Sequence, residues 1–254
     1  MITPHLLVFD LDGTLAESKQ RMSAQMGDLL SELLQKMPVA IMSGGGWAEF
    51  EKQFFSVLPI DAKLDQLYIF PQNAAQCFVH KNGTWHPQYD NAFTPAERDR
   101  ILQALEEALK ETGLATPPPH IWGKRVEDRG AEITFSVLGQ DAPPEQKQTW
   151  DPDGTKKRAL QEALIKRLPE FAVGTNSSTS VDITRQGITK AHGIKRLAEM
   201  TGTSIEHMLY VGDALDEGGN DASVIDTGVP THAVFAPRET EALIETILHA
   251  HKRN

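Results

Sequence analysis

Two aspartates, Asp10 and Asp12, follow a run of apolar residues near the start of the chain. The run, residues 6–9, predicts a buried strand that delivers both carboxylates at its C-terminal end, where Gly13 and Thr14 turn the chain away. Ligands of open α/β sheets collect at the carboxyl ends of the strands. Of two carboxylates placed there, one can attack a substrate or bind a metal while the other moves a proton. The alternative is a strand that ends in an ordinary turn, because Asp and Gly both favour turns.

A second apolar run that ends in aspartate lies near the other end of the chain. Residues 207–212 lead into Asp213, and an acidic, glycine-rich segment with Asn220 and Asp221 follows. In a parallel sheet Asp10 and Asp213 would lie at the same edge, where their carboxylates repel one another unless a cation lies between them. Oxygen ligands of this kind are typical of Mg²⁺, and no His or Cys cluster with zinc-like spacing competes with them. The alternative is an acidic surface loop.

Two further segments carry groups that bind phosphate. Ser43 and Gly44 follow a second predicted strand, residues 39–42, and supply a hydroxyl and free backbone N–H groups. Lys190 begins a predicted helix and can bring a positive charge to the same edge of the sheet. Neither signal is specific alone, because serine followed by glycines is also a plain loop and a single lysine is more often a solvated surface residue.

The composition is that of an acidic globular protein. The 254 residues are 40% hydrophobic and 24% charged, with a net charge of −10, which allows a large core in one or two domains. No sustained basic run is present, so we expect no nucleic-acid partner. No signal peptide and no apolar window of about 18 residues is present, so we expect no membrane association. Cys77 is the only cysteine, which fits a reducing compartment, and we expect a cytoplasmic protein.

The order of the predicted elements indicates an α/β protein with an inserted domain. Strands and helices alternate over residues 1–88 and again over 186–254, which favours a Rossmann-like parallel sheet with right-handed crossovers. Residues 89–185 instead contain a helix followed by two strands, a pattern that occurs twice. Two such units predict a mainly antiparallel sheet with helices on one face and the other face free to close over a ligand. The expected helices are residues 95–111 and 153–168, and the expected strands are 120–127, 131–138, 171–174 and 179–184.

The order and spacing of the motifs resemble those of the haloacid dehalogenase superfamily of phosphotransferases. The four ordered motifs of that superfamily are matched, in chain order, by Asp10 with Asp12, Ser43, Lys190 and Asp213. The inserted double unit resembles the cap of the IIB branch, which contains Cof-type sugar phosphatases and eukaryotic-type phosphomannomutases. The resemblance implies a catalytic core made of the two outer segments and a cap, made of the inserted segment, that selects the substrate.

The same resemblance implies a role for each motif residue. Asp10 is expected to attack phosphorus and form an aspartyl phosphate, and Asp12 to protonate the leaving oxygen and then activate the attacking hydroxyl or water. Ser43, Gly44 and Lys190 are expected to hold the phosphoryl oxygens. Mg²⁺ is the implied cofactor. Its implied ligands are Asp10, Asp213 and the backbone carbonyl of Asp12, with an outer shell completed by Asn220 and Asp221.

Within the IIB branch, the cap and the fourth motif resemble those of the phosphomannomutase family. Ser180 and Asp182 match a sugar-contacting strand of that family, and Arg129 stands where it has a phosphate-binding arginine. Three other arginines of the family are replaced, by Lys19, Gln140 and Lys147. Lysine lacks the bidentate fork of arginine, and glutamine brings no charge. Because a mutase must hold a bisphosphate, the weakened second phosphate grip favours a phosphatase.

We therefore expect Mg²⁺-dependent phosphoryl transfer through an aspartyl phosphate, with hydrolysis of a hexose phosphate as the first hypothesis. A phosphomannomutase that interconverts mannose 1-phosphate and mannose 6-phosphate is the alternative, and a non-catalytic phosphosugar-binding protein is the second alternative. The expected partner is a small sugar phosphate, and cap-mediated dimers of the mutase family leave a homodimer open. The residues expected to bind the substrate are Lys19, Arg129, Lys147, Ser180 and Asp182.

Overall fold

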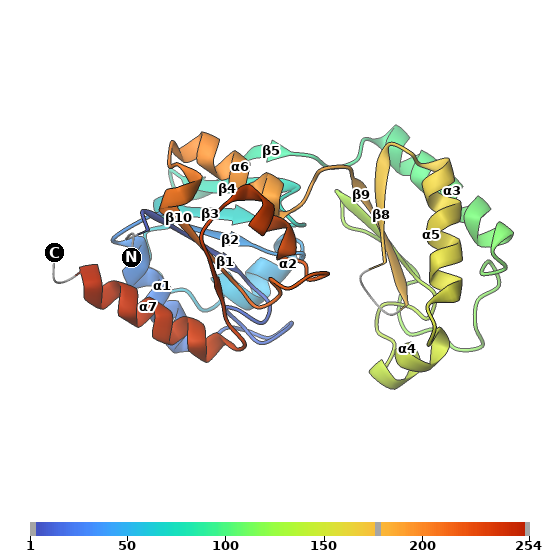
Figure 1. Ribbon diagram of the computed structural model, residues 1–254, viewed down its shortest axis with the longest axis horizontal. Coiled ribbons are helices and arrows are strands. Elements are labelled where there is room, and N and C mark those ends of the chain that lie inside the picture. The colour runs from blue at the N-terminus through green and yellow to red at the C-terminus, as the bar shows by residue number, and fades with distance from the viewer. Residues whose placement is uncertain (1–3, 176–178, 252–254) are drawn as a thin grey trace. The chain divides into compact units, whose positions relative to one another are not determined.

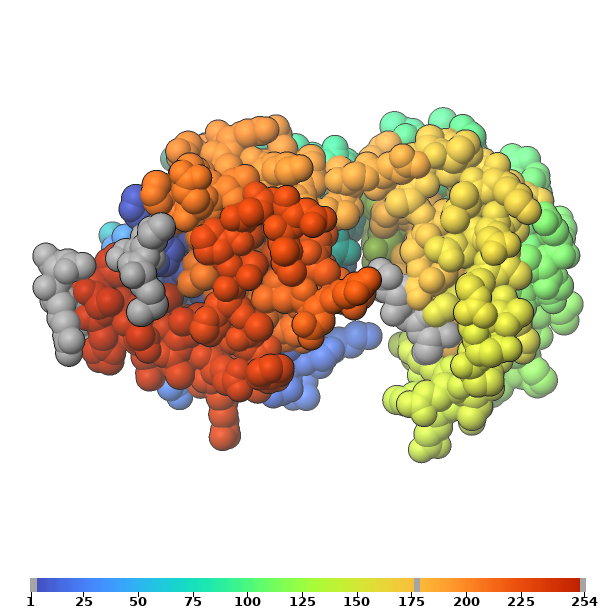
Figure 2. Space-filling model, viewed as in Figure 1, coloured from blue at the N-terminus to red at the C-terminus, as the bar shows by residue number. Residues whose placement is uncertain are grey.

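The computed structural model of the chain describes residues 4–175 and 179–251, which form two compact units (Figure 1). Unit 1 lies within Met1–Asp90 and Ile188–Asn254, and unit 2 is Asn91–Gly187. Unit 1 thus combines both ends of the chain, and blue N-terminal atoms and orange to red C-terminal atoms lie together in it (Figure 2). Among the described residues, no helix has the length and apolar character needed to cross a membrane.

Unit 1 is built on a seven-stranded sheet with the order β11-β10-β1-β2-β3-β4-β5. The strands from β11 to β3 pair in parallel, and β4 and β5 extend the sheet in antiparallel pairs. The strands are Leu6–Asp10 (β1), Val39–Met42 (β2), Leu67–Phe70 (β3), Gln76–Lys81 (β4), Thr84–Asp90 (β5), Met208–Gly212 (β10) and Thr231–Ala233 (β11). The predicted α/β class with a Rossmann-like, mainly parallel core sheet is confirmed.

β1 is buried on both faces, which explains its continuous apolar sequence. Leu7 and Phe9 belong to a hydrophobic cluster with residues of α1 and α7, and Leu6 and Val8 belong to another with residues of α6. These helices are Ala24–Leu34 (α1), Lys190–Thr201 (α6) and Pro237–His251 (α7). The shorter helical segments are Trp47–Phe50 (α2), Glu51–Phe55 (η1), Leu64–Gln66 (η2), Ile205–His207 (η3) and Ala222–Thr227 (η4). Because helices cover both faces of the strand, its carboxyl end is the place where it can present a polar group.

Unit 2 is a four-stranded antiparallel sheet with the order β6-β7-β9-β8. Its strands are Val126–Asp128 (β6), Glu132–Ser136 (β7), Phe171–Gly174 (β8) and Ser180–Arg185 (β9), and its helices are Pro95–Glu111 (α3), Pro144–Trp150 (α4) and Thr155–Arg167 (α5). Helices α3 and α5 cover one face of the sheet (Figure 1). They form a hydrophobic cluster with four side chains of the central strands, Ile133, Phe135, Val181 and Ile183. The predicted antiparallel sheet with helices on one face is confirmed.

The strand predicted over residues 120–127 is wrong for most of its length, because the structure has only Val126–Asp128 (β6) there. The preceding residues form irregular hydrogen bonds instead. The Trp122 N–H donates to the carbonyl of Leu138 at 2.8 Å, and the Trp122 carbonyl accepts from Asp141 at 3.0 Å. Gly123 has a φ of 75°, a left-handed conformation that interrupts an extended strand. The sheet edge is therefore shorter than the sequence pattern indicated.

Arg185, the last residue of β9, ties together the two chain ends of unit 2. Its guanidinium donates to both carboxylate oxygens of Glu97 at 2.7 Å and to the carbonyls of Asn91 and Ala92 at 2.9 and 3.1 Å. Glu97 also forms a capping box with Thr94 at the start of α3. These hydrogen bonds, first of all those from Arg185, lower the pKa of Glu97 to about 2.

We expect Glu97→Gln to reduce the free energy of unfolding at pH 7 by about 1 kcal/mol, because glutamine keeps the helix cap but loses the charge of a partly exposed ion pair. The pKa of Glu97 is lower in the folded chain than in the unfolded one, so the pair stabilises the fold above about pH 4.5 and this contribution is lost as the pH falls towards about 2. Urea unfolding followed by circular dichroism should therefore show a larger difference between wild type and variant at pH 7 than at pH 3.

The matched control is Glu106→Gln, which removes a solvent-exposed ion pair with Lys110 on the same helix. This control should leave the unfolding curve at pH 7 almost unchanged. An equal loss of stability in both variants would contradict the role assigned to the Arg185–Glu97 pair.

Candidate active site

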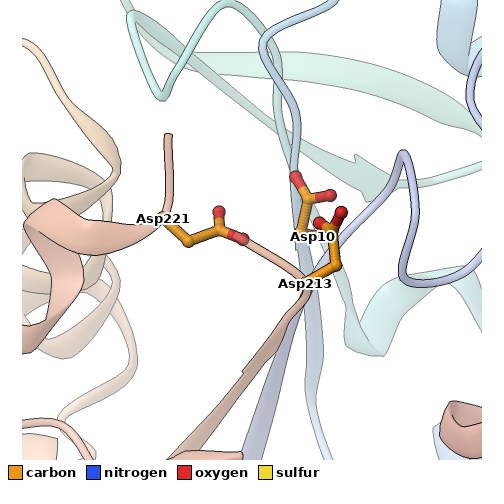
Figure 3. A group of neighbouring side chains, drawn as sticks. All are labelled: Asp10, Asp213 and Asp221. Carbon is orange, nitrogen blue, oxygen red and sulfur yellow. The ribbon is translucent and has the colours of Figure 1, made fainter. Parts of the chain in front are cut away.

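The carboxyl ends of β1 and β10 bring Asp10 and Asp213 together. Phe9 pairs with Val211 in parallel register, so both strands leave the sheet at the same edge. Figure 3 shows these two carboxylates close to each other, with Asp221 reaching towards them from the segment that follows β10. Carboxylate oxygens of the three aspartates all lie within 4.8 Å of one another. Parallel pairing of neighbouring strands thus produces a three-carboxylate cluster, which we call the acidic cluster.

Two glycines allow the aspartates of the acidic cluster to lie so close to the backbone. Gly13 has a φ of 82°, and a Cβ atom at this position would collide with the carboxylate of Asp213. A Cβ atom at Gly212 would collide with the carboxylate of Asp221. The glycine of the first motif is therefore required by the close approach of an aspartate from the fourth motif as well as by the turn.

Lys190, the first residue of α6, is the cation beside the acidic cluster. It is only 1% exposed, and its ammonium donates to Oδ1 of Asp10 and, at 2.5 Å, to Oδ1 of Asp221. Burial alone would lower the pKa of Lys190, but the two carboxylates raise it above its usual value. The ammonium therefore stays protonated. A cation at a helix N-terminus is disfavoured by the helix dipole, so its place depends on these two carboxylates.

One ammonium does not neutralise the acidic cluster. Burial raises the pKa of Asp10 to about 7, with Lys190 opposing the rise and Asp221 adding to it. Burial and then the charge of Asp221 also raise the pKa of Asp213. Among the described residues, Oδ2 of Asp10 is buried and has no hydrogen-bond partner. An unpartnered carboxylate oxygen within excess negative charge fits a hard divalent cation, which takes oxygen ligands and restores the ionised state of the carboxylates.

Asp221 is the member of the acidic cluster with the most hydrogen bonds. Its Oδ1 accepts from Lys190 and from the hydroxyl of Tyr210 at 2.6 Å, and its Oδ2 accepts from the backbone N–H of Ala214 at 3.2 Å. The family resemblance predicts Asp221 in the outer shell of the metal, and the sequence patterns did not identify Tyr210 as a site residue. The available signal was a tyrosine in an otherwise apolar buried strand, because a buried phenol needs a hydrogen-bond partner.

Three other expected site residues of unit 1 lie outside the acidic cluster. Asp12 is half-buried, and its Oδ1 accepts the backbone N–H of Lys19 at 2.7 Å. Lys19 is exposed and has a φ of 59°, so this loop residue presents its side chain to solvent. Asn220 is exposed as well, next to the buried Asp221. Their roles as proton carrier, substrate contact and metal ligand stay predictions.

Ser43 and Gly44 directly follow β2, which pairs in parallel with β1, so they lie at the same sheet edge as Asp10. The Ser43 side chain is buried, and its Oγ accepts the backbone N–H of Gly45 at 2.9 Å. This bond uses the oxygen as an acceptor and leaves the hydroxyl hydrogen able to donate to another oxygen. The arrangement fits the phosphate-binding role expected for this segment.

Ser180 and Asp182 lie on β9, on the sheet face of unit 2 opposite α3 and α5. They alternate with Val181 and Ile183, which pack against those helices, and alternate side chains of a strand point to opposite faces. Asp182 accepts the hydroxyl of Thr134 at 2.9 Å, from the neighbouring strand β7. Burial raises the pKa of Asp182 above its usual value. This polar face carries the residues that the sequence assigned to the sugar.

Arg129, the expected phosphate ligand of unit 2, is held by two glutamates. Its Nε and Nη2 donate to Oε2 of Glu127 at 3.0 and 2.6 Å, and its Nη1 donates to Oε1 of Glu132 at 2.9 Å. Glu132 is buried, and burial followed by the charge of Asp182 raises its pKa. Sequence reasoning did not identify either glutamate as a partner of Arg129.

Two other basic residues of unit 2, Lys147 and Arg125, also have partners in the structure. The ammonium of Lys147 donates to the carbonyl of Gln140 at 3.1 Å. The guanidinium of Arg125 lies over the ring of Phe135 and donates to the carbonyl of Leu114 at 3.0 Å. Because Phe135 packs in the cluster on the helix side of the sheet, Arg125 does not add positive charge to the polar face.

Known proteins are similar to this chain in sequence and in fold. The family described as haloacid dehalogenase-like hydrolase matches residues 140–227. A Caenorhabditis elegans protein named "Probable phosphomannomutase" is 26% identical over 257 residues, which cover 96% of this chain and 95% of that protein. The structure of N-terminally truncated, IMP-bound Plasmodium falciparum IMP-nucleotidase has a TM-score of 0.63 at 18% identity, over 96% of this chain and 68% of that one. The C-terminal domain of C. albicans trehalose-6-phosphate phosphatase has a TM-score of 0.63 at 14% identity, over 98% of this chain and 93% of that one.

The resemblance to the haloacid dehalogenase superfamily is confirmed. The matched segment, residues 140–227, contains Lys190, Asp213 and Asp221, and it does not include Asp10 or Asp12. The solved structures share the fold, and the named relatives agree with the expected class, a phosphohydrolase or phosphomannomutase-like enzyme. Phosphoryl transfer of the haloacid dehalogenase type is therefore the chemistry supported for this site.

We expect Mg²⁺ to raise the melting temperature of the EDTA-treated protein, because an ion that binds only the folded state stabilises it, by about 2.7 kcal/mol at 100 times its Kd. Asp213→Asn should abolish most of this rise and weaken Mg²⁺ binding in isothermal titration calorimetry. Asp216→Asn is the matched control, since Asp216 is an exposed aspartate of the same segment that is not in the acidic cluster. If Mg²⁺ stabilises all three proteins equally, the acidic cluster is not its site.

Proposed function

We propose that the protein is a Mg²⁺-dependent phosphatase that hydrolyses a sugar phosphate through an aspartyl phosphate on Asp10. One observation carries this proposal. Asp10 is buried at the end of the central strand with Oδ1 bound to Lys190, while its Oδ2 has no partner among the described residues. Phosphoryl transfer depends mainly on positioning and on neutralising charge, and a fixed carboxylate beside a buried ammonium supplies both.

The residues of unit 1 can carry the two half-reactions. In the first, one carboxylate oxygen of Asp10 bonds to phosphorus, the bond from phosphorus to the sugar oxygen breaks, and Asp12 gives a proton to the leaving oxygen. In the second, Asp12 takes a proton from water, the water oxygen bonds to phosphorus, and Asp10 leaves as a free carboxylate beside inorganic phosphate. Lys190 and Ser43 hold phosphoryl oxygens throughout. When bound, Mg²⁺ neutralises the repulsion between the aspartates and the phosphate.

The charges of unit 2 favour water, rather than a hydroxyl of a sugar phosphate, as the acceptor of the phosphoryl group. We assign unit 2 the role of a substrate-selecting cap. A mutase holds a bisphosphate and needs strong positive charge for the second phosphate. Here Arg129 is already bound to Glu127 and Glu132, and Asp182 lies on the same polar face. An incoming phosphate would have to displace a carboxylate from Arg129 and would be repelled by those that remain.

Phosphomannomutase is the second candidate function, and the named relatives favour it. The Caenorhabditis elegans relative called a probable phosphomannomutase matches nearly the whole chain. A non-catalytic phosphosugar-binding protein is the third candidate, and the buried ion pair of Asp10 with Lys190 counts against it. A homodimer through unit 2 and a cytoplasmic location stay predictions.

Incubation with mannose 1-phosphate and a trace of hexose 1,6-bisphosphate separates the two enzymes. We expect stoichiometric free phosphate without mannose 6-phosphate, and no turnover in EDTA. Asp10→Asn should lower the rate about a thousandfold, because an amide is a far poorer nucleophile than a carboxylate. Asp61→Asn, at an exposed aspartate of unit 1, is the matched control and should keep full activity. Mannose 6-phosphate as the main product would establish the mutase instead, and full activity in EDTA would exclude the metal.

A second test concerns the charge of the polar face. Glu132→Gln removes one of the two carboxylates that hold Arg129, so we expect kcat/KM for hexose 1,6-bisphosphate relative to hexose 6-phosphate to rise about tenfold, equivalent to 1.4 kcal/mol. Glu111→Gln is the matched control, because Glu111 and Glu107 hold Arg167 in the same way between α3 and α5. The control should leave the ratio unchanged. A ratio that does not respond to Glu132→Gln would contradict the role given to this face.

A further inference from the structure

We propose that Tyr210 is a positioning residue that keeps Lys190 available to the phosphoryl group, by sharing the carboxylate of Asp221 with it. The inference rests on the proposed function, because it takes Lys190 as the ligand of the phosphoryl oxygens. It adds a residue from inside the sheet that touches neither substrate nor metal and acts through Asp221.

Tyr210 reaches the acidic cluster from the middle of β10. It has no exposed surface, and its hydroxyl donates to Oδ1 of Asp221 at 2.6 Å. Burial, together with the nearby Asp221, raises the pKa of Tyr210 well above its usual value, so the phenol remains a hydrogen-bond donor. A buried aromatic ring needs no hydroxyl to fill a core, and a phenylalanine would occupy nearly the same volume in this strand. The effect of the hydroxyl is therefore its hydrogen bond to Asp221.

Tyr210 and Lys190 donate to the same oxygen atom. Oδ1 of Asp221 accepts from the phenol and, at 2.5 Å, from the ammonium, while Oδ2 accepts from the Ala214 N–H. The carboxylate of Asp221 thus has three hydrogen-bond donors, of which the Tyr210 hydroxyl and the Ala214 N–H are neutral. The two neutral donors stabilise part of its negative charge. Without the phenol, Lys190 would be the one side chain among the described residues that donates to Oδ1, and the charged pair would tighten.

The position of the Lys190 ammonium decides what it can bind. It has three hydrogens, of which one points to Asp10 and one to Asp221, and the third can serve a phosphoryl oxygen. If Asp221 attracts the ammonium more strongly, the ammonium moves away from Asp10 and from a phosphate held there. The hydroxyl of Tyr210 thus balances Lys190 between its two carboxylates.

The test uses Tyr210→Phe, which removes one oxygen atom and keeps the ring. We expect the Kd of inorganic phosphate, measured by isothermal titration calorimetry on the full chain in Mg²⁺, to rise about tenfold. KM for the sugar phosphate should rise with it, and kcat should change less. Tyr89→Phe is the matched control, because Tyr89 is a phenol of unit 1 that donates to the carbonyl of Ala74 at 3.0 Å. A purely structural role predicts a lower melting temperature in both variants and an unchanged phosphate Kd in both.

Asp221→Asn provides a second variant in case Tyr210→Phe does not fold. It removes the charge that attracts Lys190, so phosphate should bind this variant without Mg²⁺ at least as tightly as it binds the wild type. Weaker binding there, or a phosphate Kd of Tyr210→Phe within twofold of the wild type, would overturn the proposal. The phosphate titrations do not need turnover. If the protein released no phosphate from any sugar phosphate, the proposed function would be refuted, and the titrations would still test the role of Tyr210.

Discussion

The buried ion pairs of Lys190 with Asp10 and Asp221 are the interaction on which the rest of the structure depends. Moving an ammonium and two carboxylates out of water is costly, and removing one partner of such a buried pair costs about 3–5 kcal/mol. A chain selected for stability alone would fill this space with apolar side chains. Retaining the charges makes sense where their field acts on a ligand. The excess of carboxylates over ammonium fits a site that is stabilised when a cation binds, as does the oxygen of Asp10 that has no partner among the described residues. Under the proposed function, that cation would also help to hold Asp10 as the nucleophile.

The parallel sheet produces this arrangement by simple geometry. Strands that run side by side end at one edge, so residues separated by some two hundred positions meet there without any long loop. Helices on both faces keep the strands dry, and the polar groups are therefore confined to the strand ends. Gly13 and Gly212 then set how closely the carboxylates approach, since a side chain at either position would occupy the place of Asp213 or Asp221. The first and fourth motifs are thus two halves of one steric arrangement.

The same geometry explains how much the sequence alone could predict. An apolar run followed by aspartate specifies a strand end, and parallel strands share an edge, so the α/β fold and the meeting of Asp10 with Asp213 follow from periodicity. The side-chain partners that meet across neighbouring strands do not follow from periodicity. Whether Tyr210 reaches Asp221, or Glu132 reaches Arg129, depends on register and side-chain direction, which no spacing rule supplies. The composition of residues 120–127 predicts a strand, whereas the left-handed conformation of Gly123 interrupts it and only its end, in β6, is extended. Sequence patterns thus indicate where elements end better than they indicate what each side chain touches.

Arg129 shows why that distinction matters for function. From the sequence alone, Arg129 is a cation suited to binding phosphate, and this interpretation favours a mutase. In the structure its guanidinium is already bound to Glu127 and Glu132. A guanidinium that serves two carboxylates contributes no net positive field, and a polar face that also carries Asp182 attracts hydroxyl donors and repels anions. Under the proposed function, substrate choice by unit 2 would depend on the charge balance around Arg129, to which the two glutamates contribute as much as the arginine does.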